Sequence, residues 1–229
     1  FAGWYDQLSG GRRYGDENGN CTSPYYKTED STLYARWDLI RRTVIYNANG
    51  GILTGPDKGE FWQNSMLPEP SDPVRTGYDF TGWYTNAACT NKWNFYDWAT
   101  GDMTLYAGWQ INRYTITFDT AGGSEIAPVT QDYNTNVNAP ADPTREGYRF
   151  DGWDKEIPDT MPGEDIKITA KWSINQYTIT FDTAGGSEIA PVTQDYNTVV
   201  NAPADPTREG YRFDGWDKKI PDTMPAGDI

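Results

Sequence analysis

The chain has 229 residues, a net charge of −14 and a sequence pI of about 4.3. A charge of that sign repels phosphate backbones, so we expect no nucleic-acid partner. The sequence has no His, which excludes Ser-His-Asp, Cys-His and His-metal chemistry, and no apolar run approaches the roughly 20 residues of a transmembrane helix. We therefore predict no catalytic residues, no cofactor, no metal site and no transmembrane segment in this stretch.

The chain opens with part of a sequence pattern that later segments contain in full. Residues 1–38 hold a Phe-x-Gly-Trp element at Phe1–Trp4 and a closing Leu-Tyr-Ala-Arg-Trp element that ends at Trp37. We assign these residues to the C-terminal half of a repeat module. Residues 39–110 add an alternating segment that ends in a Gly-Gly pair, so we assign them to a complete module with a longer loop.

A block of 53 residues then occurs twice, almost without change. Tyr114–Ile166 returns as Tyr177–Ile229, at an offset of 63 residues. Four positions differ: Asn136/Val199, Glu156/Lys219, Gly163/Ala226 and Glu164/Gly227. Self-similarity at a fixed period is the signature of a repeat array. We therefore predict a complete module at residues 111–173, the upstream repeat, and a module that lacks its last strand at residues 174–229, the downstream repeat.

Each complete module is predicted to contain four strands. In the upstream repeat, Tyr114–Asp119 alternates between apolar and polar residues, which favours a half-buried strand. A second extended segment spans Val129–Tyr133, and a third begins at Tyr148 and contains a bulge at Gly152. Ile166–Trp172 alternates again. A sheet of about 60 residues is marginally stable, so its large aromatic side chains must supply the core.

The downstream repeat ends where the upstream repeat begins its last strand. Ile229 aligns with Ile166, so the sequence holds no counterpart of Lys167–Trp172. We expect the downstream sheet to have an unpaired edge, to be poorly ordered, or to borrow a strand from another molecule. Because the chain starts and stops inside modules, we also interpret it as a fragment of a longer protein.

The segments between modules are short and contain neither Gly nor Pro. They span Asp38–Arg41, Gln110–Arg113 and Ser173–Gln176. Segments of this length are too short to behave as flexible coils. We therefore predict that neighbouring modules of the same chain contact one another and that the array is an elongated rod.

Three recurring motifs give the chain a family resemblance: Tyr-Thr-Ile-Thr-Phe-Asp followed by Gly-Gly, Pro-Thr-Arg-Glu-Gly-Tyr-x-Phe-x-Gly-Trp, and Leu-Tyr-Ala-x-Trp. The chain resembles the Listeria–Bacteroides repeat family, to which the B repeats of listerial internalins belong. That resemblance implies mostly β or small α+β modules with a β-grasp-like, ubiquitin-like sheet. It also implies a secreted or surface-attached bacterial protein, in which such repeats form stalks and are linked to adhesion, and it brings no catalytic residues.

Most of the ten Trp residues are expected in the core, because they recur at the same motif positions in every module. These are Trp4, Trp37, Trp83, Trp109, Trp153, Trp172 and Trp216. Trp93 lies in another family-like stretch and is also predicted to be structural. Trp62 and Trp98, with Tyr96 nearby, have no such place in the pattern. They are the aromatic residues that we propose for ligand contact, since surface aromatics often mark interfaces.

The abundant carboxylates raise the alternative of a glycosidase with a paired-carboxylate site. The candidates are Asp119, Glu125, Asp132, Asp151, Asp154 and Glu156. They are scattered over predicted polar faces and loops, so we interpret them as a solvated acidic surface. Cys21 and Cys89 occupy one locus in two successive modules, and neighbouring modules would separate them too far for a disulfide. We expect two free thiols.

Two hypotheses for function remain open after this reading. The first is a non-catalytic stalk or spacer segment of an extracellular, cell-surface bacterial protein, and the family resemblance implies that this protein is an adhesin. The second is a module that binds a host glycan or a host-surface protein through the exposed aromatics of residues 39–110. An enzyme is the least favoured alternative.

Overall fold

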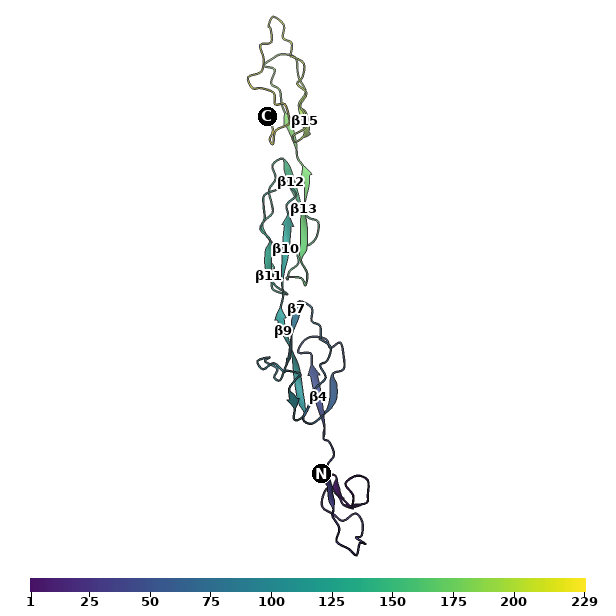
Figure 1. The fold of residues 1–229 in the computed structure, drawn as a ribbon. Helices are drawn as coiled ribbons and strands as arrows, with labels where there is room; N and C mark the ends of the chain where they lie inside the picture. Colours follow the sequence, from purple (N-terminus) through teal and green to yellow (C-terminus); the bar gives the residue numbers. More distant parts are fainter. The chain divides into compact units, whose positions relative to one another are not determined.

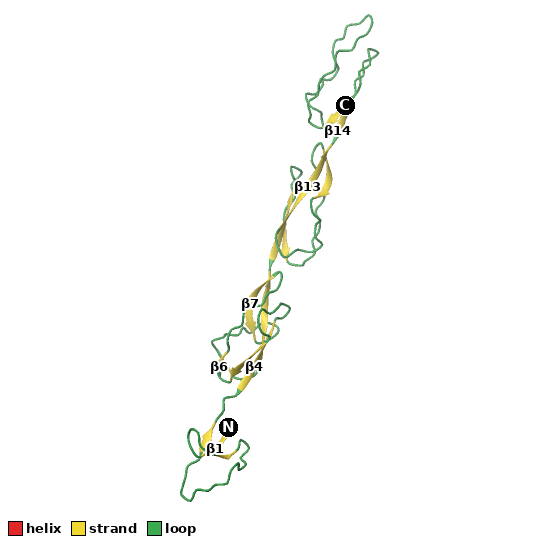
Figure 2. Cartoon of the chain, turned by 90° about the vertical axis from the view of Figure 1, so that its right-hand side faces the viewer, coloured by secondary structure: helices red, strands yellow, loops and turns green.

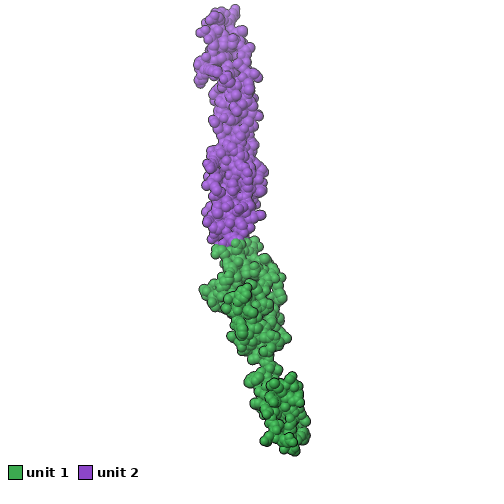
Figure 3. Space-filling view, viewed as in Figure 1, with its two compact units in different colours: residues 1–110 green, residues 111–229 purple.

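The computed structural model describes all residues, 1–229, and consists of strands, turns and loops (Figure 2). It contains no helix that could span a membrane. The chain divides into two compact units, residues 1–110 and 111–229 (Figure 3). The structure therefore confirms the expectation of modules built mostly from β-strands.

The first unit begins with a small antiparallel sheet of three strands in the order β2-β1-β3. Its strands are β1 (Gly3–Tyr5), β2 (Arg13–Gly15) and β3 (Tyr34–Arg36). Residues 1–38 contribute no buried cluster of hydrophobic side chains. Its strands are therefore held by backbone pairing rather than by a core.

The rest of the first unit is built on a mixed four-stranded sheet in the order β5-β4-β9-β7. Its strands are β4 (Arg41–Asn47), β5 (Lys58–Trp62), β7 (Tyr78–Tyr84) and β9 (Met103–Ile111). The central pair, β4 and β9, is parallel, whereas β5 pairs with β4 in the antiparallel direction. The longer loop between β7 and β9 contains β8 (Trp98–Ala99), which pairs with β6 (Ser65–Met66) in a separate two-stranded ribbon.

The upstream repeat has the same arrangement, in the order β11-β10-β13-β12 (Figure 1). Its strands are β10 (Arg113–Asp119), β11 (Val129–Asp132), β12 (Tyr148–Trp153) and β13 (Ile166–Ile174). All four predicted strands are present, and β10 pairs with β13 in parallel. The predicted bulge is confirmed, because the register of β12 on β13 shifts between Phe150 and Gly152.

The downstream repeat forms only two strands, β14 (Gln176–Ile179) and β15 (Val192–Asp195). We expected a downstream sheet with one unpaired edge. That expectation is too simple, because β13 is a central strand of the upstream sheet, and a strand that is absent at this position is absent from the middle of the sheet and not from its edge. Its two neighbours in the upstream repeat are β10 and β12. In the downstream repeat the counterpart of β10 shortens to β14, and the counterpart of β12 is not a strand.

The core of each repeat lies under one face of its sheet. In the upstream repeat, Ile116, Phe118, Met161 and Ile168 are buried together. The inward face of β13 follows the predicted alternation, with Ile168 fully buried and Lys167 and Lys171 exposed. A separate cluster in residues 39–110 includes Trp83 and Leu105, and a smaller one in the downstream repeat includes Ile179 and Met224.

The motif tryptophans were predicted to lie in the core. This prediction is correct in the two sheets whose central strands run parallel, β4 with β9 and β10 with β13. The Trp83 ring packs on Tyr46 of β4, and the Trp153 ring packs on Phe118 of β10. Trp93 also packs against the core of residues 39–110, as expected. The assignment does not hold for Trp4 and Trp37, which are 42% and 74% exposed, because this sequence begins at Phe1 and includes no counterpart of β4 or β10 for them to pack against.

Candidate functional site

Trp62 lies at the end of β5 and is 42% exposed. It pairs with Arg41 on β4, whose guanidinium lies 4.9 Å from the centroid of the indole. A cation above one face of the ring leaves the other face for a ligand or solvent. The structure thus places this predicted contact residue on the surface.

Trp98 is displayed on the β6–β8 ribbon. It pairs with Met66, and the two side chains are 67% and 55% exposed. The ribbon is attached to the body of the repeat because the next residue, Ala99, is buried, and its carbonyl accepts a hydrogen bond from the amide of Asn64 at 2.8 Å. Sequence reasoning missed Met66, whose only signal is its place across the ribbon from Trp98.

Tyr96 lies in the tight turn that precedes β8 and is 83% exposed. The carbonyl of Asn94 accepts the amide of Asp97 at 2.9 Å, and the Asn94 side chain accepts the amide of Tyr96 at 3.2 Å. No ring–ring contact joins Tyr96 to either Trp62 or Trp98. The three rings are accessible platforms for stacking.

Within the second unit, the upstream and downstream repeats meet at a short junction. One residue, Asn175, separates β13 from β14. Its amide donates to the carbonyl of Gly147 at 2.9 Å, and its carbonyl accepts the amide of Tyr196 at 2.9 Å. Asn175 therefore connects the β12 end of one repeat with the β15 end of the next through its backbone.

Tyr196 completes this junction by packing between the repeats. Its ring makes edge contacts with Tyr148 at 6.2 Å and with Tyr177 at 6.5 Å, measured between ring centroids. It also covers Gly147, where an added Cβ would come within 2.1 Å of the Tyr196 ring. Sequence reasoning did not single out Tyr196. No local pattern indicates it, because its contacts are with Gly147 and Tyr148 of the preceding repeat.

Three of the carboxylates considered for hydrolysis, Asp119, Asp151 and Asp154, have structural partners. Asp119 bonds to Lys167 at 2.7 Å, and the Lys167 ammonium holds the pKa of that carboxyl below its usual value. Asp151 accepts the Ser173 hydroxyl, which lowers the pKa of its carboxyl. Asp154 accepts the amide of Thr169 at 2.6 Å. The pKa values of Asp119 and Asp151 are therefore shifted in the opposite direction to the raised pKa of a general acid.

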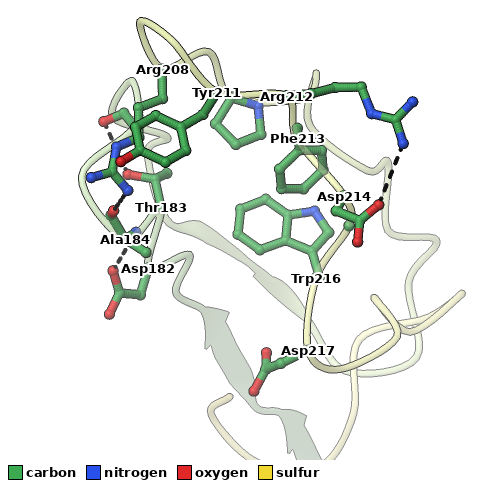
Figure 4. A pocket seen from close by; sticks show the side chains of 13 residues that line it. Asp182, Thr183, Ala184, Arg208, Tyr211, Arg212, Phe213, Asp214, Trp216 and Asp217 are labelled. Atoms are coloured by element: carbon green, nitrogen blue, oxygen red, sulfur yellow. Dashed lines mark hydrogen bonds and ion pairs between the residues drawn. The ribbon is translucent and has the colours of Figure 1, made fainter.

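This sequence ends at Ile229, before any counterpart of β13, and this leaves an open slot in the downstream repeat (Figure 4). One wall holds Asp182, Thr183 and Gly186, and the other holds Tyr211, Phe213 and Trp216. The cavity between them has a volume of about 430 Å³. A second cavity of about 170 Å³ continues the slot, lined by residues that include Ile179, Phe181, Ile220 and Ile229.

The repeated mixed sheets, aromatic cores and tied carboxylates define a tandem array of small β modules. A profile of the Listeria-Bacteroides repeat domain matches residues 43–108, 114–171 and 177–224. Because these matches cover more than half of the sequence, the chain belongs to the Listeria-Bacteroides repeat family.

The chain also resembles longer proteins over parts of their length. It is 36% identical over 194 residues to a protein of Evansella cellulosilytica, provisionally named a membrane protein; the match covers 81% of the chain and 29% of that relative. It is 37% identical over 126 residues to Internalin H of Listeria monocytogenes, covering 49% of the chain and 22% of the internalin. The chain therefore spans less than a third of the length of these curated relatives.

One solved structure aligned with the chain comprises Streptococcal High Identity Repeats in Tandem (SHIRT) domains 3-4 from a cell surface protein. The alignment covers 58% of this chain and 98% of that one, with 15% sequence identity and a TM-score of 0.22. A score this low does not relate the two folds.

Proposed function

We propose that the chain is a non-catalytic stalk or spacer segment of an extracellular bacterial cell-surface protein, and that this protein is an adhesin. Its modules are β-grasp-like sheets with boundaries at residues 1–38, 39–110, 111–173 and 174–229, and they form an elongated rod. Membership of the Listeria-Bacteroides repeat family and the likeness to an internalin support this proposal.

The observation that favours a spacer is the junction between the upstream and downstream repeats. A flexible connection would require several residues free of tertiary contacts. Here one residue, Asn175, lies between β13 and β14, and both of its backbone groups are bonded to neighbouring segments. The Tyr196 ring fills the space against Gly147 and Tyr148. Such a junction limits bending and would hold a distal domain at a set distance.

Small-angle scattering tests the spacer. A compact protein of 229 residues has a radius of gyration of about 17 Å by the size scaling of domains. A stiff array of modules should give a clearly larger value and a distance distribution with a long tail. A radius near the compact value would refute the spacer. Labelling of intact bacterial cells with an antibody against the chain tests the surface location.

A second candidate function is favoured by the exposure of Trp62, Tyr96 and Trp98. Flat aromatic surfaces stack on sugar rings or insert into protein interfaces, and the upstream and downstream repeats have no Trp at these places. The partner of this alternative is a host glycan or a host-surface protein.

A glycan array and binding to host-cell extracts, each with the Trp98→Ala variant, test this alternative. The variant should lose binding while its melting temperature stays within about 2 °C of the parent, because surface substitutions change stability little. Tyr26→Ala is the matched control, since Tyr26 is also well exposed, at 69%, but lies in residues 1–38. Equal binding by both variants and the parent would rule out the aromatic site.

A further inference from the structure

We propose that the solvent-facing side of strands β4 and β5 binds an uncharged oligosaccharide. One pyranose ring stacks on Trp62, and the next sugar unit lies over a hollow beside Thr43. This inference rests on the second candidate function, binding through exposed aromatics, and narrows its partner to a neutral glycan. Besides Trp62, the site consists of Arg41, Thr43, Glu60, Asp102 and Thr104.

The alternation of the two strands brings four of these side chains to one face of the sheet. In the antiparallel ladder, Arg41 lies opposite Trp62 and Thr43 lies opposite Glu60. All four residues are exposed, whereas Phe61, between Glu60 and Trp62, is buried in the core. Because side chains opposite one another on one face lie about 4.5–5.5 Å apart, the four form a continuous strip.

The Trp62 indole is held in place before a ligand arrives. The guanidinium of Arg41 lies 4.9 Å from the centroid of the indole and forms an ion pair with the Glu60 carboxylate. The Ser65 hydroxyl donates to the carbonyl of Trp62 at 2.6 Å, which fixes the backbone at the end of β5. An ordered ring loses little conformational entropy when a sugar stacks on it, so more of the contact free energy contributes to affinity.

An open hollow with polar groups lies next to this strip. Its volume is about 440 Å³, and it is lined by Thr43, Ile45, Asp102, Met103 and Thr104. One oxygen of the Asp102 carboxylate accepts the amide of Thr43 at 2.8 Å. The other oxygen lies 3.9 Å from the Arg42 guanidinium, which is too long for a hydrogen bond. That oxygen and the threonine hydroxyls are therefore available to the hydroxyl groups of a sugar.

The ring is specific to residues 39–110. In the antiparallel ladders of the upstream and downstream repeats, Asp132 and Asp195 take the place of Trp62. Asp132 forms an ion pair at 3.5 Å with Arg113, the counterpart of Arg41. Both aspartates are partly exposed, although a complete module precedes Asp195. A side chain at this position is therefore accessible within an array of repeats.

The hollow also depends on a residue that differs between the repeats. Thr104 pairs with Ile45 across the parallel ladder of β4 and β9. In the upstream repeat, Lys167 occupies the position of Thr104, and its ammonium reaches across the sheet to Asp119 at 2.7 Å. The short threonine leaves free the space that the longer lysine side chain occupies in the upstream repeat.

The chemistry of the strip favours a sugar over a protein partner. A stable protein interface buries about 800 Å² on each side and has a centre that is depleted of charge. Here one indole and one isoleucine lie among charged and hydroxyl-bearing side chains. The electron-rich face of the indole complements the C–H face of a pyranose, and the few polar groups around it complement the hydroxyls of the sugar.

The charges around the site select an uncharged ligand. The side chains of Glu60 and Asp102 are 64% and 66% exposed, and the whole chain has a net charge of −14. Sialylated and sulfated glycans would be repelled by this field. Neutral sugars suit it, because hydroxyl groups form strong hydrogen bonds to carboxylates.

An array of neutral, sialylated and sulfated oligosaccharides tests the proposal with the whole chain. We expect binding to neutral oligosaccharides and no requirement for sialic acid or sulfate. The neutral oligosaccharide that gives the strongest signal is then titrated in solution by calorimetry. We expect one binding site per chain.

Two variants introduce side chains that the upstream repeat already accommodates at the same positions. Trp62→Asp removes the ring and gives Arg41 a carboxylate partner, as in the upstream repeat. Thr104→Lys fills the hollow. Each variant should bind at least about tenfold more weakly, while its melting temperature stays within about 2 °C of the parent.

Two further variants serve as controls. Trp62→Phe should bind more tightly than Trp62→Asp, because a flat ring remains for stacking. Ile52→Ala should bind as the parent does, since Ile52 is 70% exposed but lies outside both strands of the strip.

The outcomes separate this site from the function on which it rests. Loss of binding in Trp98→Ala, with full binding in Trp62→Asp and Thr104→Lys, would overturn the site and leave binding through exposed aromatics intact. Binding of a protein from host-cell extracts, with no neutral oligosaccharide bound, would also overturn the site and leave that function with a protein partner. Binding that requires sialic acid or sulfate would refute the selection for an uncharged ligand and the proposal with it.

Discussion

Truncating Ile168 to Ala should bring the upstream repeat close to unfolding. Ile168 is fully buried on the central strand and belongs to the core with Ile116, Phe118 and Met161. Removing the equivalent of three methylene groups costs about 2.4 kcal/mol in transfer free energy. The cavity left behind raises the total to about 3–4 kcal/mol. A module of about 60 residues has roughly 3–9 kcal/mol of stability, so little remains.

Hydrogen exchange is the suitable assay, but the choice of segment matters. Residues 114–135 and 177–198 are identical in sequence, so peptides from them cannot be assigned to one repeat. Ile166–Ile174 is unique, and its amides pair on both sides of β13. A loss of 3 kcal/mol should speed exchange there by about 100-fold or more.

Lys171→Ala is the control in the same strand, because Lys171 points to solvent. It should change stability by less than about 0.5 kcal/mol. If the amides of Ile166–Ile174 exchanged no faster in Ile168→Ala than in Lys171→Ala, the central strand would not be the structural core of the repeat.

Three further predictions follow from paired features of the two repeats. The hydrogen bond from Lys167 keeps the pKa of the Asp119 carboxyl below 3.8. The stability that this ion pair contributes is therefore present above pH 3.8 and is lost as the pH falls through the lowered pKa. Lys167→Met should therefore lower the melting temperature at pH 7, and the difference from the parent should vanish as the pH falls below the lowered pKa of Asp119; a constant difference would contradict this sign. Gly123→Ala should destabilise its repeat by about 1–3 kcal/mol, because the new Cβ meets the Trp172 ring. Gly186→Ala should lower the free energy of unfolding by less, as measured by denaturant unfolding. Equal losses in the two variants would show that the Trp172 ring moves aside. Tyr196→Ala should leave the secondary structure intact but broaden the distribution of distances between spin labels placed on the two repeats. An unchanged distribution would show that the backbone hydrogen bonds of Asn175 are sufficient to hold the junction.

The strands of a complete repeat could be predicted from residue pattern. The alternation along Tyr114–Asp119 and Ile166–Trp172 placed both strands with the correct faces, since a side-chain period of two defines which residues share a face. Gly152 marked the bulge for a similar local reason. The exposed positions of Trp62, Tyr96 and Trp98 followed from their absence from the recurring motif.

The residue pattern failed to predict burial where a side chain packs against a strand far away in the sequence. Trp4 occupies the same motif position as Trp83 and Trp153, yet it is 42% exposed, because this sequence begins at Phe1 and includes no strand that corresponds to β4 or β10. The junction was also beyond local reasoning. Tyr196 contacts Tyr148, which is 48 residues earlier, and nothing in either segment alone indicates the contact.

The two repeats separate the contributions of sequence and tertiary structure with unusual clarity. Residues 148–153 and 211–216 are the same six residues, Tyr-Arg-Phe-Asp-Gly-Trp. The first set is the strand β12 and the second is irregular beyond an isolated bridge at Tyr211. The sequence by itself determined the repeat period, the family and the face that each side chain prefers. Only the tertiary structure decided that residues 148–153 become a strand, because a strand needs hydrogen-bonding partners on an adjacent one. β13 supplies these partners, and this sequence stops at Ile229, before any counterpart of β13 for residues 211–216.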